Sequence, residues 1–126
     1  MTTRPIVVDH VLFVVGDLAA SRRLYTAALA PLGYEELHVQ EDGVHYGVEG
    51  IDDFAIYQGA PVTTAAHVAF DATARPSVDA FFEAALSRGA TARGEPGVPP
   101  LFHSRRAYAQ ATWRHVLFGW VLGRLA

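Results

Sequence analysis

Two short stretches of this chain resemble each other and carry a histidine at the same point. Residues 9–13 read Asp-His-Val-Leu-Phe and residues 66–70 read Ala-His-Val-Ala-Phe, so His10 and His67 are equivalent. With the same offset, an earlier Ala-Ala-Leu recurs without a gap at residues 84–86. Because matching helical segments accompany the matching histidines, we predict that one small module occurs twice.

The first module is predicted to contain a strand, a helix and three further strands. Residues 6–15 are almost continuously apolar and β-branched, which predicts a strand buried on both faces. Asp17 is a good N-cap for a helix over residues 18–31, and Gly33 would end it. Turn signals then separate three strands, over residues 34–39, 43–48 and 52–58.

The second module begins in the same way, with a strand over residues 65–70 and a helix over residues 77–88. Residues 94–100 are rich in glycine and proline and predict a loop, whereas residues 113–121 have helical spacing. We therefore predict an α+β fold of two βαβββ modules that form a curved mixed sheet, the second with an atypical C-terminal end. The chain would be a single domain over residues 1–126, with module one at about residues 5–60, module two at about 64–126 and an atypical tail at 104–126.

Composition argues against several classes of protein. The formal net charge is -3, so the clustered basic surface that a nucleic-acid partner requires is not expected. The apolar run near the C-terminus is too short for a membrane span and contains Arg124. The chain has no cysteine and its N-terminus does not resemble a signal peptide, which together favour a cytoplasmic location.

The two equivalent histidines are the main candidates for chemistry. Strand alternation would place His10 on the same face as Leu12, while Val11 and Phe13 would face the helix. His67 would lie likewise in its own strand, so both imidazoles would point to helix-free faces. Two histidines with a carboxylate bind a transition metal and leave positions open for water and substrate. The simpler alternative is that each histidine fills a half-buried strand position with a hydrogen bond.

These features resemble the vicinal oxygen chelate superfamily, which includes glyoxalase I, extradiol dioxygenases, fosfomycin-resistance transferases and bleomycin-resistance proteins. The likeness covers about residues 5–103. It is carried by Asp9-His10-Val11 before Asp17-Leu18, by Leu24-Tyr25 through Pro31-Leu32-Gly33-Tyr34, and by His67-Val68-Ala69-Phe70 before Val78-Asp79-Ala80-Phe81. The sequence Glu95-Pro96-Gly97 followed by Phe102-His103 is similar to the small bacterial glyoxalase-like branch.

The resemblance implies a glyoxalase-like metal centre in which His10 and His67 are ligands of a divalent transition metal, namely Zn, Fe, Ni or Mn. It also implies a carboxylate ligand from the last strand, but no acidic residue follows Glu95. His103, His115 or an acid of the first module would have to replace that carboxylate.

Several further residues are candidates for a site. Aromatic residues and one histidine would line the substrate cleft, namely Tyr46, Tyr57, Phe102, His103 and Tyr108. Gln58 is the late candidate for a ligand in the fourth strand of module one. His38 and His45 are expected to be ordinary surface residues. The neighbours Asp52 and Asp53 are expected to point to opposite faces of their strand.

Three functions stay open at this point. The first is a metal-dependent enzyme of lyase or dioxygenase type that acts on a small molecule with vicinal oxygens. The second is a metal-free protein of the bleomycin-resistance type that sequesters a ligand, and the net charge of -7 over residues 1–102 would suit a cationic one. The third is an inactive relative. The expected partners are a small-molecule ligand and a second copy of the chain in a homodimer.

Overall fold

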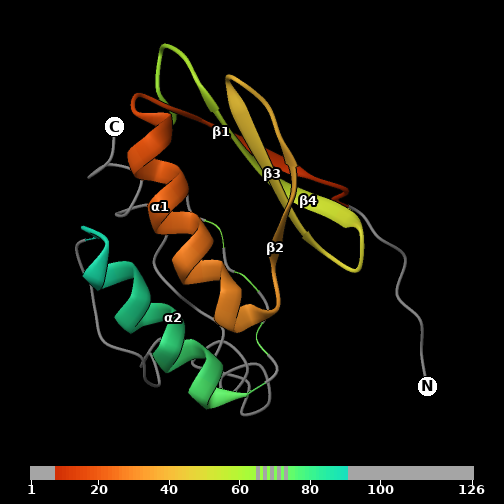
Figure 1. Cartoon of the computed structure of the whole chain (residues 1–126), viewed down its shortest axis with the longest axis vertical. Helices are drawn as coiled ribbons and strands as arrows, with labels where there is room; N and C mark the ends of the chain where they lie inside the picture. Colours follow the sequence, from red (N-terminus) through yellow and green to blue (C-terminus); the bar gives the residue numbers. More distant parts are fainter. Residues whose placement is uncertain are drawn as a thin grey trace, which may run out of the picture.

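The computed structural model describes residues 8–64 and 74–90, together with residues 66, 68, 70 and 72. Its elements are, in order, β1 (Val11–Val15), α1 (Leu18–Leu29), the 3-10 helix η1 (Ala30–Leu32), β2 (Glu35–Val39), β3 (Gly43–Val48), β4 (Ile51–Gln58) and α2 (Arg75–Ser87). Figure 1 shows α1 and α2 side by side, with α1 nearer the sheet. The helices thus lie on one face of the sheet.

Helix α1 begins and ends at the residues that the sequence indicates. The Asp17 side chain accepts a hydrogen bond of 3.0 Å from the backbone N–H of Ala20, which satisfies a donor that a helix leaves unpaired at its start. After η1, Gly33 adopts a left-handed φ of 88° and donates to the carbonyl of Ala30. Glycine avoids the steric cost of that conformation because it has no Cβ. The predicted helix over residues 18–31 is therefore confirmed.

Four strands form one mixed sheet in the order β1-β4-β3-β2. β1 runs parallel to β4, and the other two pairs are antiparallel. The pairing of β3 with β4 contains a bulge, because Tyr46 pairs with Phe54 while Gly47 pairs with Asp52, which leaves Asp53 as an extra residue. A one-residue shift moves the side chains beyond it to the other face of the sheet. Asp52 therefore faces away from α1.

The chain returns from β4 to the outer edge of β1. The backbone N–H of Thr63 donates to the carbonyl of Val14 at 2.9 Å, and the Thr63 hydroxyl accepts from the Val14 N–H, also at 2.9 Å. Both hydrogen-bonding groups of Val14 are thus satisfied by one residue of the connecting segment.

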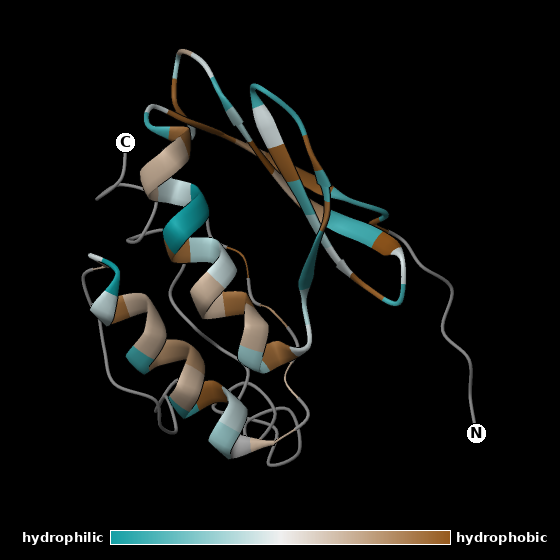
Figure 2. Ribbon diagram, viewed as in Figure 1, coloured by the Kyte–Doolittle hydropathy of each residue, from teal (hydrophilic) through white to brown (hydrophobic). Residues whose placement is uncertain are grey.

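Phe54 lies at the centre of the hydrophobic core. Its ring centroid is 5.1 Å from that of Phe13, 5.2 Å from that of Tyr25 and 5.1 Å from that of Phe70. Helix α2 joins the same core through three buried side chains, Val78, Phe81 and Ala85. In Figure 2 the strands and both helices combine hydrophobic and hydrophilic residues, as expected of elements that bury one face. The core therefore includes residues from both predicted modules.

Most of module one agrees with the sequence prediction, and two features differ. The three strands after α1 are confirmed within a residue or so at each end. β1, however, begins only at Val11. The prediction that this strand is buried on both faces is wrong, because Leu12 is 47% exposed. In a βαβββ unit the helix covers one face of the sheet, and Leu12 lies on the other.

The second module is described only in part. Helix α2 confirms the predicted helix over residues 77–88, although it begins two residues earlier, and Gly89 follows it with a left-handed φ of 100°. Where the sequence predicts a strand over residues 65–70, the described residues Ala66, Val68 and Phe70 are outside any strand. The predicted loop at 94–100 and the tail at 104–126 lie outside the described residues. Neither of the described α-helices has the length and hydrophobicity that a membrane span requires.

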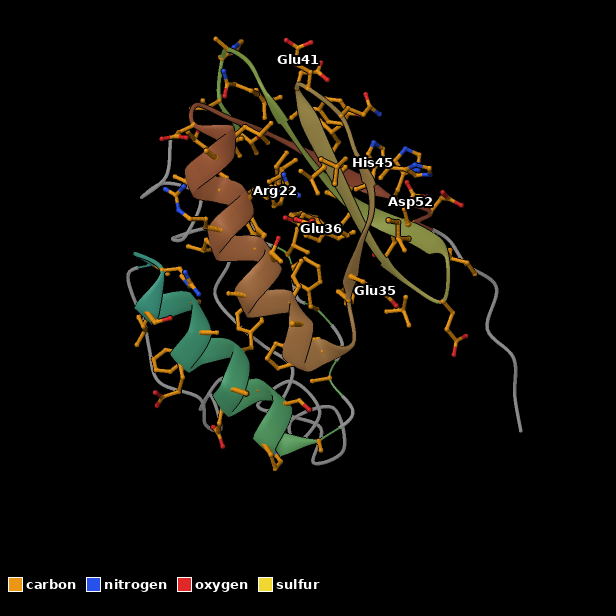
Figure 3. The ribbon with its side chains drawn as sticks, viewed as in Figure 1. Arg22, Glu35, Glu36, Glu41, His45 and Asp52 are labelled. Atoms are coloured by element: carbon orange, nitrogen blue, oxygen red, sulfur yellow. The ribbon has the colours of Figure 1, made fainter. Side chains whose placement is uncertain are left out.

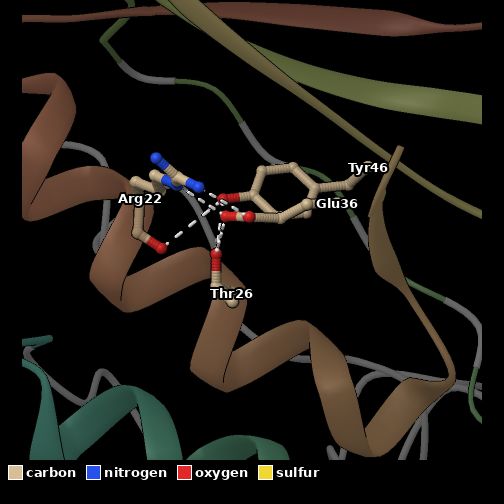
Figure 4. Close-up of polar contacts among 4 residues, drawn as sticks. All are labelled: Arg22, Thr26, Glu36 and Tyr46. Carbon is tan, nitrogen blue, oxygen red and sulfur yellow. Dashed lines mark hydrogen bonds and ion pairs between the residues drawn. The ribbon is translucent and has the colours of Figure 1, made fainter. Parts of the chain in front are cut away.

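A hydrogen-bonded cluster connects α1 to β2 and β3 (Figure 4). The Arg22 guanidinium donates to both carboxylate oxygens of Glu36, at 2.7 and 2.8 Å. The Thr26 hydroxyl donates to the same carboxylate at 2.7 Å and lies 2.9 Å from the hydroxyl of Tyr46. The hydrogen bond from Arg22 is the largest cause of a lowered pKa of the Glu36 carboxyl, whereas burial raises the pKa of Tyr46 to about 12.

Replacing Glu36 with glutamine is expected to lower the free energy of unfolding by about 0.5–1 kcal/mol at neutral pH, because Arg22 loses its charged acceptor while its half-exposed guanidinium stays accessible to water. The pKa of Glu36 in the folded chain lies below its ordinary value of 4.5. The stabilisation is therefore present above that value and is lost as the pH falls through the folded-state pKa. Urea denaturation at a series of pH values measures this. Glu35→Gln, at an exposed neighbour, is the matched control, and an equal loss in both variants would contradict the prediction.

Candidate functional site

The face of the sheet away from α1 gathers polar side chains on β3 and β4. His45 pairs across the sheet with His38 on one side and Ala55 on the other, and Ala55 pairs in turn with Leu12. Cross-strand partners share a face, and the rings of His38 and His45 lie 6.0 Å apart, edge to face. We call this surface the open face; its side chains are Leu12, Val14, His38, His45, Asp52, Ala55 and Tyr57.

Three side chains of the open face form a hydrogen-bonded row. His45 Nδ1 lies 2.8 Å from a carboxylate oxygen of Asp52, and His45 Nε2 lies 2.6 Å from the hydroxyl of Tyr57. The bulge makes the first contact possible, because it turns Asp52 toward the face of His45. Figure 3 shows His45 and Asp52 close together on the side of the sheet away from α1. The hydrogen bond from His45 is the largest cause of a lowered pKa of the Asp52 carboxyl.

Tyr57 is fixed by packing as well as by hydrogen bonds. It pairs with Gly43 across the sheet, and a Cβ at position 43 would lie only 2.6 Å from the tyrosine ring. The ring therefore occupies the space that any other side chain at this position would need. The side-chain amide of Gln40 also donates to the Tyr57 hydroxyl, at 3.1 Å. The phenol oxygen is thus held between Gln40 and His45.

His10, the first predicted metal ligand, lies just before β1 and is exposed. Its Nδ1 is 2.9 Å from the carboxylate of Asp9. This hydrogen bond is the largest cause of a raised pKa of His10, and the charge of Asp52 makes a smaller contribution. An ionised carboxylate only accepts hydrogen bonds, so in the neutral imidazole Nδ1 carries the proton and Nε2 keeps its lone pair. Metal-binding histidines are commonly oriented in this way, and the His10 imidazole therefore fits a ligand role.

Of the other ligands suggested by the sequence, His67, His103 and His115 are not among the described residues. Within the described ranges there is no group of three or more His, Cys, Asp or Glu side chains that could hold a metal ion. The side-chain oxygen of Gln58 accepts a hydrogen bond of 3.0 Å from the N–H of Leu18, so it is engaged at the start of α1.

The two predicted cleft residues that the structure describes lie on opposite faces of the sheet. Tyr57 belongs to the open face, whereas Tyr46 is buried beneath α1 with its hydroxyl in the Arg22 cluster. The sequence prediction groups these two tyrosines, but side chains alternate along a strand, so the structure separates them. Tyr46 is two residues from Val44 and shares its face, whereas Tyr57 pairs with Gly43, which lies on the opposite face. The other three, Phe102, His103 and Tyr108, lie outside the described residues.

The sequence prediction also missed a group of interacting residues. It treats His45 as an ordinary surface residue, but the side chain is only 22% exposed and touches both Asp52 and Tyr57. A histidine with a carboxylate on one ring nitrogen and a hydroxyl on the other can accept a proton from that hydroxyl, since the carboxylate stabilises the imidazolium that results.

The βαβββ order, the mixed sheet and the helix layer on one face together define a glyoxalase-like α+β protein. A similar solved structure is that of a glyoxalase/bleomycin resistance protein from Albidiferax ferrireducens, with a TM-score of 0.64 and 28% sequence identity. The match covers 72% of this chain and 77% of that one. It confirms the superfamily inferred from the sequence, the vicinal oxygen chelate proteins. No protein-family model and no curated protein matches the chain.

Proposed function

We propose that this protein is a metal-dependent enzyme of the glyoxalase kind, a lyase or dioxygenase that acts on a small molecule with vicinal oxygens. His10 and His67 would be the imidazole ligands of a divalent transition metal, namely Zn, Fe, Ni or Mn. The observation that carries this proposal is the hydrogen bond of 2.9 Å between Asp9 and His10 Nδ1, because it leaves Nε2 available to a metal. The bound ion would polarise a carbonyl and hold two adjacent substrate oxygens.

The chain itself would orient the ligand and the substrate. Asp9 would keep the His10 ring in the tautomer that presents a lone pair. The exposed side chain of Leu12, two residues further along the same face, offers an apolar surface next to the proposed metal position. His67, as the equivalent residue of the repeat, would approach from the second module.

Titration of Zn²⁺ or Ni²⁺ into metal-free protein, followed by calorimetry, tests this proposal. The wild type is expected to bind one equivalent, and His10→Ala is expected to remove stoichiometric binding. Asp9→Asn is expected to weaken binding about 10- to 100-fold, since it loses only the partner of the ligand. The matched control is His38→Ala, which removes an exposed histidine of the same sheet. The metal centre would be ruled out if the wild-type protein bound neither ion. It would also be ruled out if His10→Ala bound an ion with the affinity of the wild type.

A metal-free protein that sequesters a ligand is the second candidate. The similar structure bears the name glyoxalase/bleomycin resistance protein, and residues 1–102 carry a net charge of -7, which would attract a cationic compound. A cationic ligand that raises the unfolding temperature with increasing concentration in the presence of a chelator would support this function. An inactive relative would show neither metal nor ligand binding.

The proposal also includes the oligomeric state and the cellular location of the protein. We infer a homodimer from the apolar stripe at residues 113–121, which lies outside the described residues. A cytoplasmic location is inferred from the absence of cysteine in the sequence.

A further inference from the structure

The row Asp52, His45 and Tyr57 has a definite direction of hydrogen bonding. Because the pKa of Asp52 is lowered, its carboxylate is ionised at neutral pH and only accepts. His45 Nδ1 therefore carries a proton and donates it to Asp52 across 2.8 Å. In a neutral imidazole the other nitrogen is then an acceptor, so the Tyr57 hydroxyl donates to Nε2 across 2.6 Å.

The Tyr57 oxygen has hydrogen-bond partners on two sides, Gln40 and His45. Gln40 donates to that oxygen at 3.1 Å, so the oxygen keeps a hydrogen bond after its own proton has moved to His45. When the proton passes to His45, the charge of the imidazolium is balanced by Asp52. Two titratable groups on neighbouring segments also interact with this row. The His38 ring of β2 lies edge to face with the His45 ring, and His10 interacts electrostatically with Asp52.

The backbone holds these three groups in place. Gly43 leaves room for the Tyr57 ring, and the bulge brings Asp52 to the face of His45. His45 and Tyr57 lie on regular parts of adjacent strands, so their positions do not depend on a loop. Groups fixed in this way need little rearrangement when a proton moves, which is a general requirement of acid–base sites.

We propose that Asp52, His45 and Tyr57 form an acid–base site on the open face, in which the Tyr57 oxygen is the base that meets the ligand. The ligand would be a small molecule with an acidic O–H, or with a C–H beside a carbonyl. The Tyr57 proton moves to Nε2 of His45, and the phenolate oxygen then takes the proton of the ligand, which leaves the ligand as an alkoxide or enolate. Reversal of these transfers returns the proton, so no other reactant is needed. None of the three residues is a proposed metal ligand, and the inference stands apart from the metal centre.

The reactivity of the Tyr57 oxygen tests the proposal, with p-nitrophenyl acetate as the probe. In the acylation the Tyr57 oxygen forms a bond to the carbonyl carbon, the bond to p-nitrophenolate breaks, and the phenol proton passes to His45. The full chain is incubated with the ester and a chelator, and the acetylated tyrosines are located by peptide mass spectrometry. We expect Tyr57 to be acetylated faster than N-acetyltyrosine amide, while Tyr46, buried beneath α1, stays unmodified.

Four variants separate an acid–base role from a structural one. His45→Gln is expected to lower the acetylation rate of Tyr57 about 100-fold, because an amide cannot take up a proton. Gly43→Ala keeps every reacting group but displaces the ring, and is expected to lower the rate as well. Asp52→Asn is expected to lower it less than His45→Gln. In His45→Ala, added imidazole is expected to restore the rate, which a lost structural contact would not explain.

The outcomes that overturn the proposal are equally definite. If Tyr57 is acetylated no faster than N-acetyltyrosine amide, the row is only a structural hydrogen-bond network. The same conclusion follows if the acetylation rate of Tyr57 is unchanged in His45→Gln. Far-ultraviolet circular dichroism and the thermal unfolding of each variant show that it is folded. If His45→Gln is unfolded, the response of His45→Ala to imidazole decides, and a failure of imidazole to restore acetylation in that folded variant counts against the site.

Discussion

Replacing Phe54 with alanine is expected to lower the free energy of unfolding by about 3–5 kcal/mol. The side chain is fully buried and its ring meets four other aromatic rings, those of Phe13, Tyr25, Tyr46 and Phe70. Two of these contacts, with Phe13 and Phe70, are edge-to-face pairs, which add about 0.5–1.5 kcal/mol each beyond simple burial. Denaturation in urea, monitored by circular dichroism, measures the loss.

The matched control for this variant is Phe54→Leu, which keeps much of the buried volume but removes the ring. We expect it to lose less than the alanine variant, because the cavity is smaller. Phe70 comes from the chain beyond β4, so the alanine variant is also expected to loosen the contact between the two predicted modules. If the urea midpoint of unfolding of both variants equalled that of the wild type, Phe54 would not be the centre of the core.

Replacing Gly47 with alanine is expected to cost about 1–3 kcal/mol or more, which is typical of a side chain forced into filled space. A Cβ at this position would overlap the backbone carbonyl of Ile51, which belongs to the facing strand. A backbone carbonyl cannot rotate away as a side chain can, so the β3–β4 hairpin would have to open. The opening would also move Asp52 away from His45, because Asp52 pairs with Gly47.

Gly50→Ala is the matched control in the same hairpin. Gly50 has a left-handed φ of 79°, but no atom lies within 4 Å of the position that its Cβ would take. We expect this variant to lose only about 1 kcal/mol, from backbone strain alone. Urea denaturation of both variants gives the comparison, and the NMR signal of the His45 ring reports its contact with Asp52. Equal destabilisation would mean that the close approach at Gly47 is not decisive.

The architecture of module one could be predicted because its signals are local. Asp17 and Gly33 bound the first helix by their own conformational preferences, and the turn residues at 41–43 and 49–50 separate the strands. The exposed Leu12 could not be predicted in this way. An apolar run indicates a strand, but it does not reveal which faces are covered by other elements.

The relation between His45 and Asp52 could not be predicted, because it depends on one extra residue in β4. Regular alternation predicts that Asp52 and Asp53 point to opposite faces of the strand, and this prediction is confirmed. Asp52 contacts His45, whereas Asp53 accepts a hydrogen bond from the Tyr34 hydroxyl. Which aspartate shares the face of His45 depends on the position of the bulge. The available signal was Gly47, where the missing side chain permits the approach of Ile51. The pairing of His10 with His67 stays a prediction.

The hydrogen bonds between Thr63 and Val14 have a consequence for the behaviour of this protein at high concentration. An edge strand with unpaired N–H and C=O groups is a template on which another chain can add a strand and begin a fibril. On β1 the Val14 groups are already bound to Thr63, and on β2 the opposite edge is interrupted by a bulge next to Glu36. A neighbouring chain would have to displace Thr63 to pair with Val14, or straighten that bulge to pair along β2, so the connection between the modules hinders ordered aggregation at this part of the β1 edge.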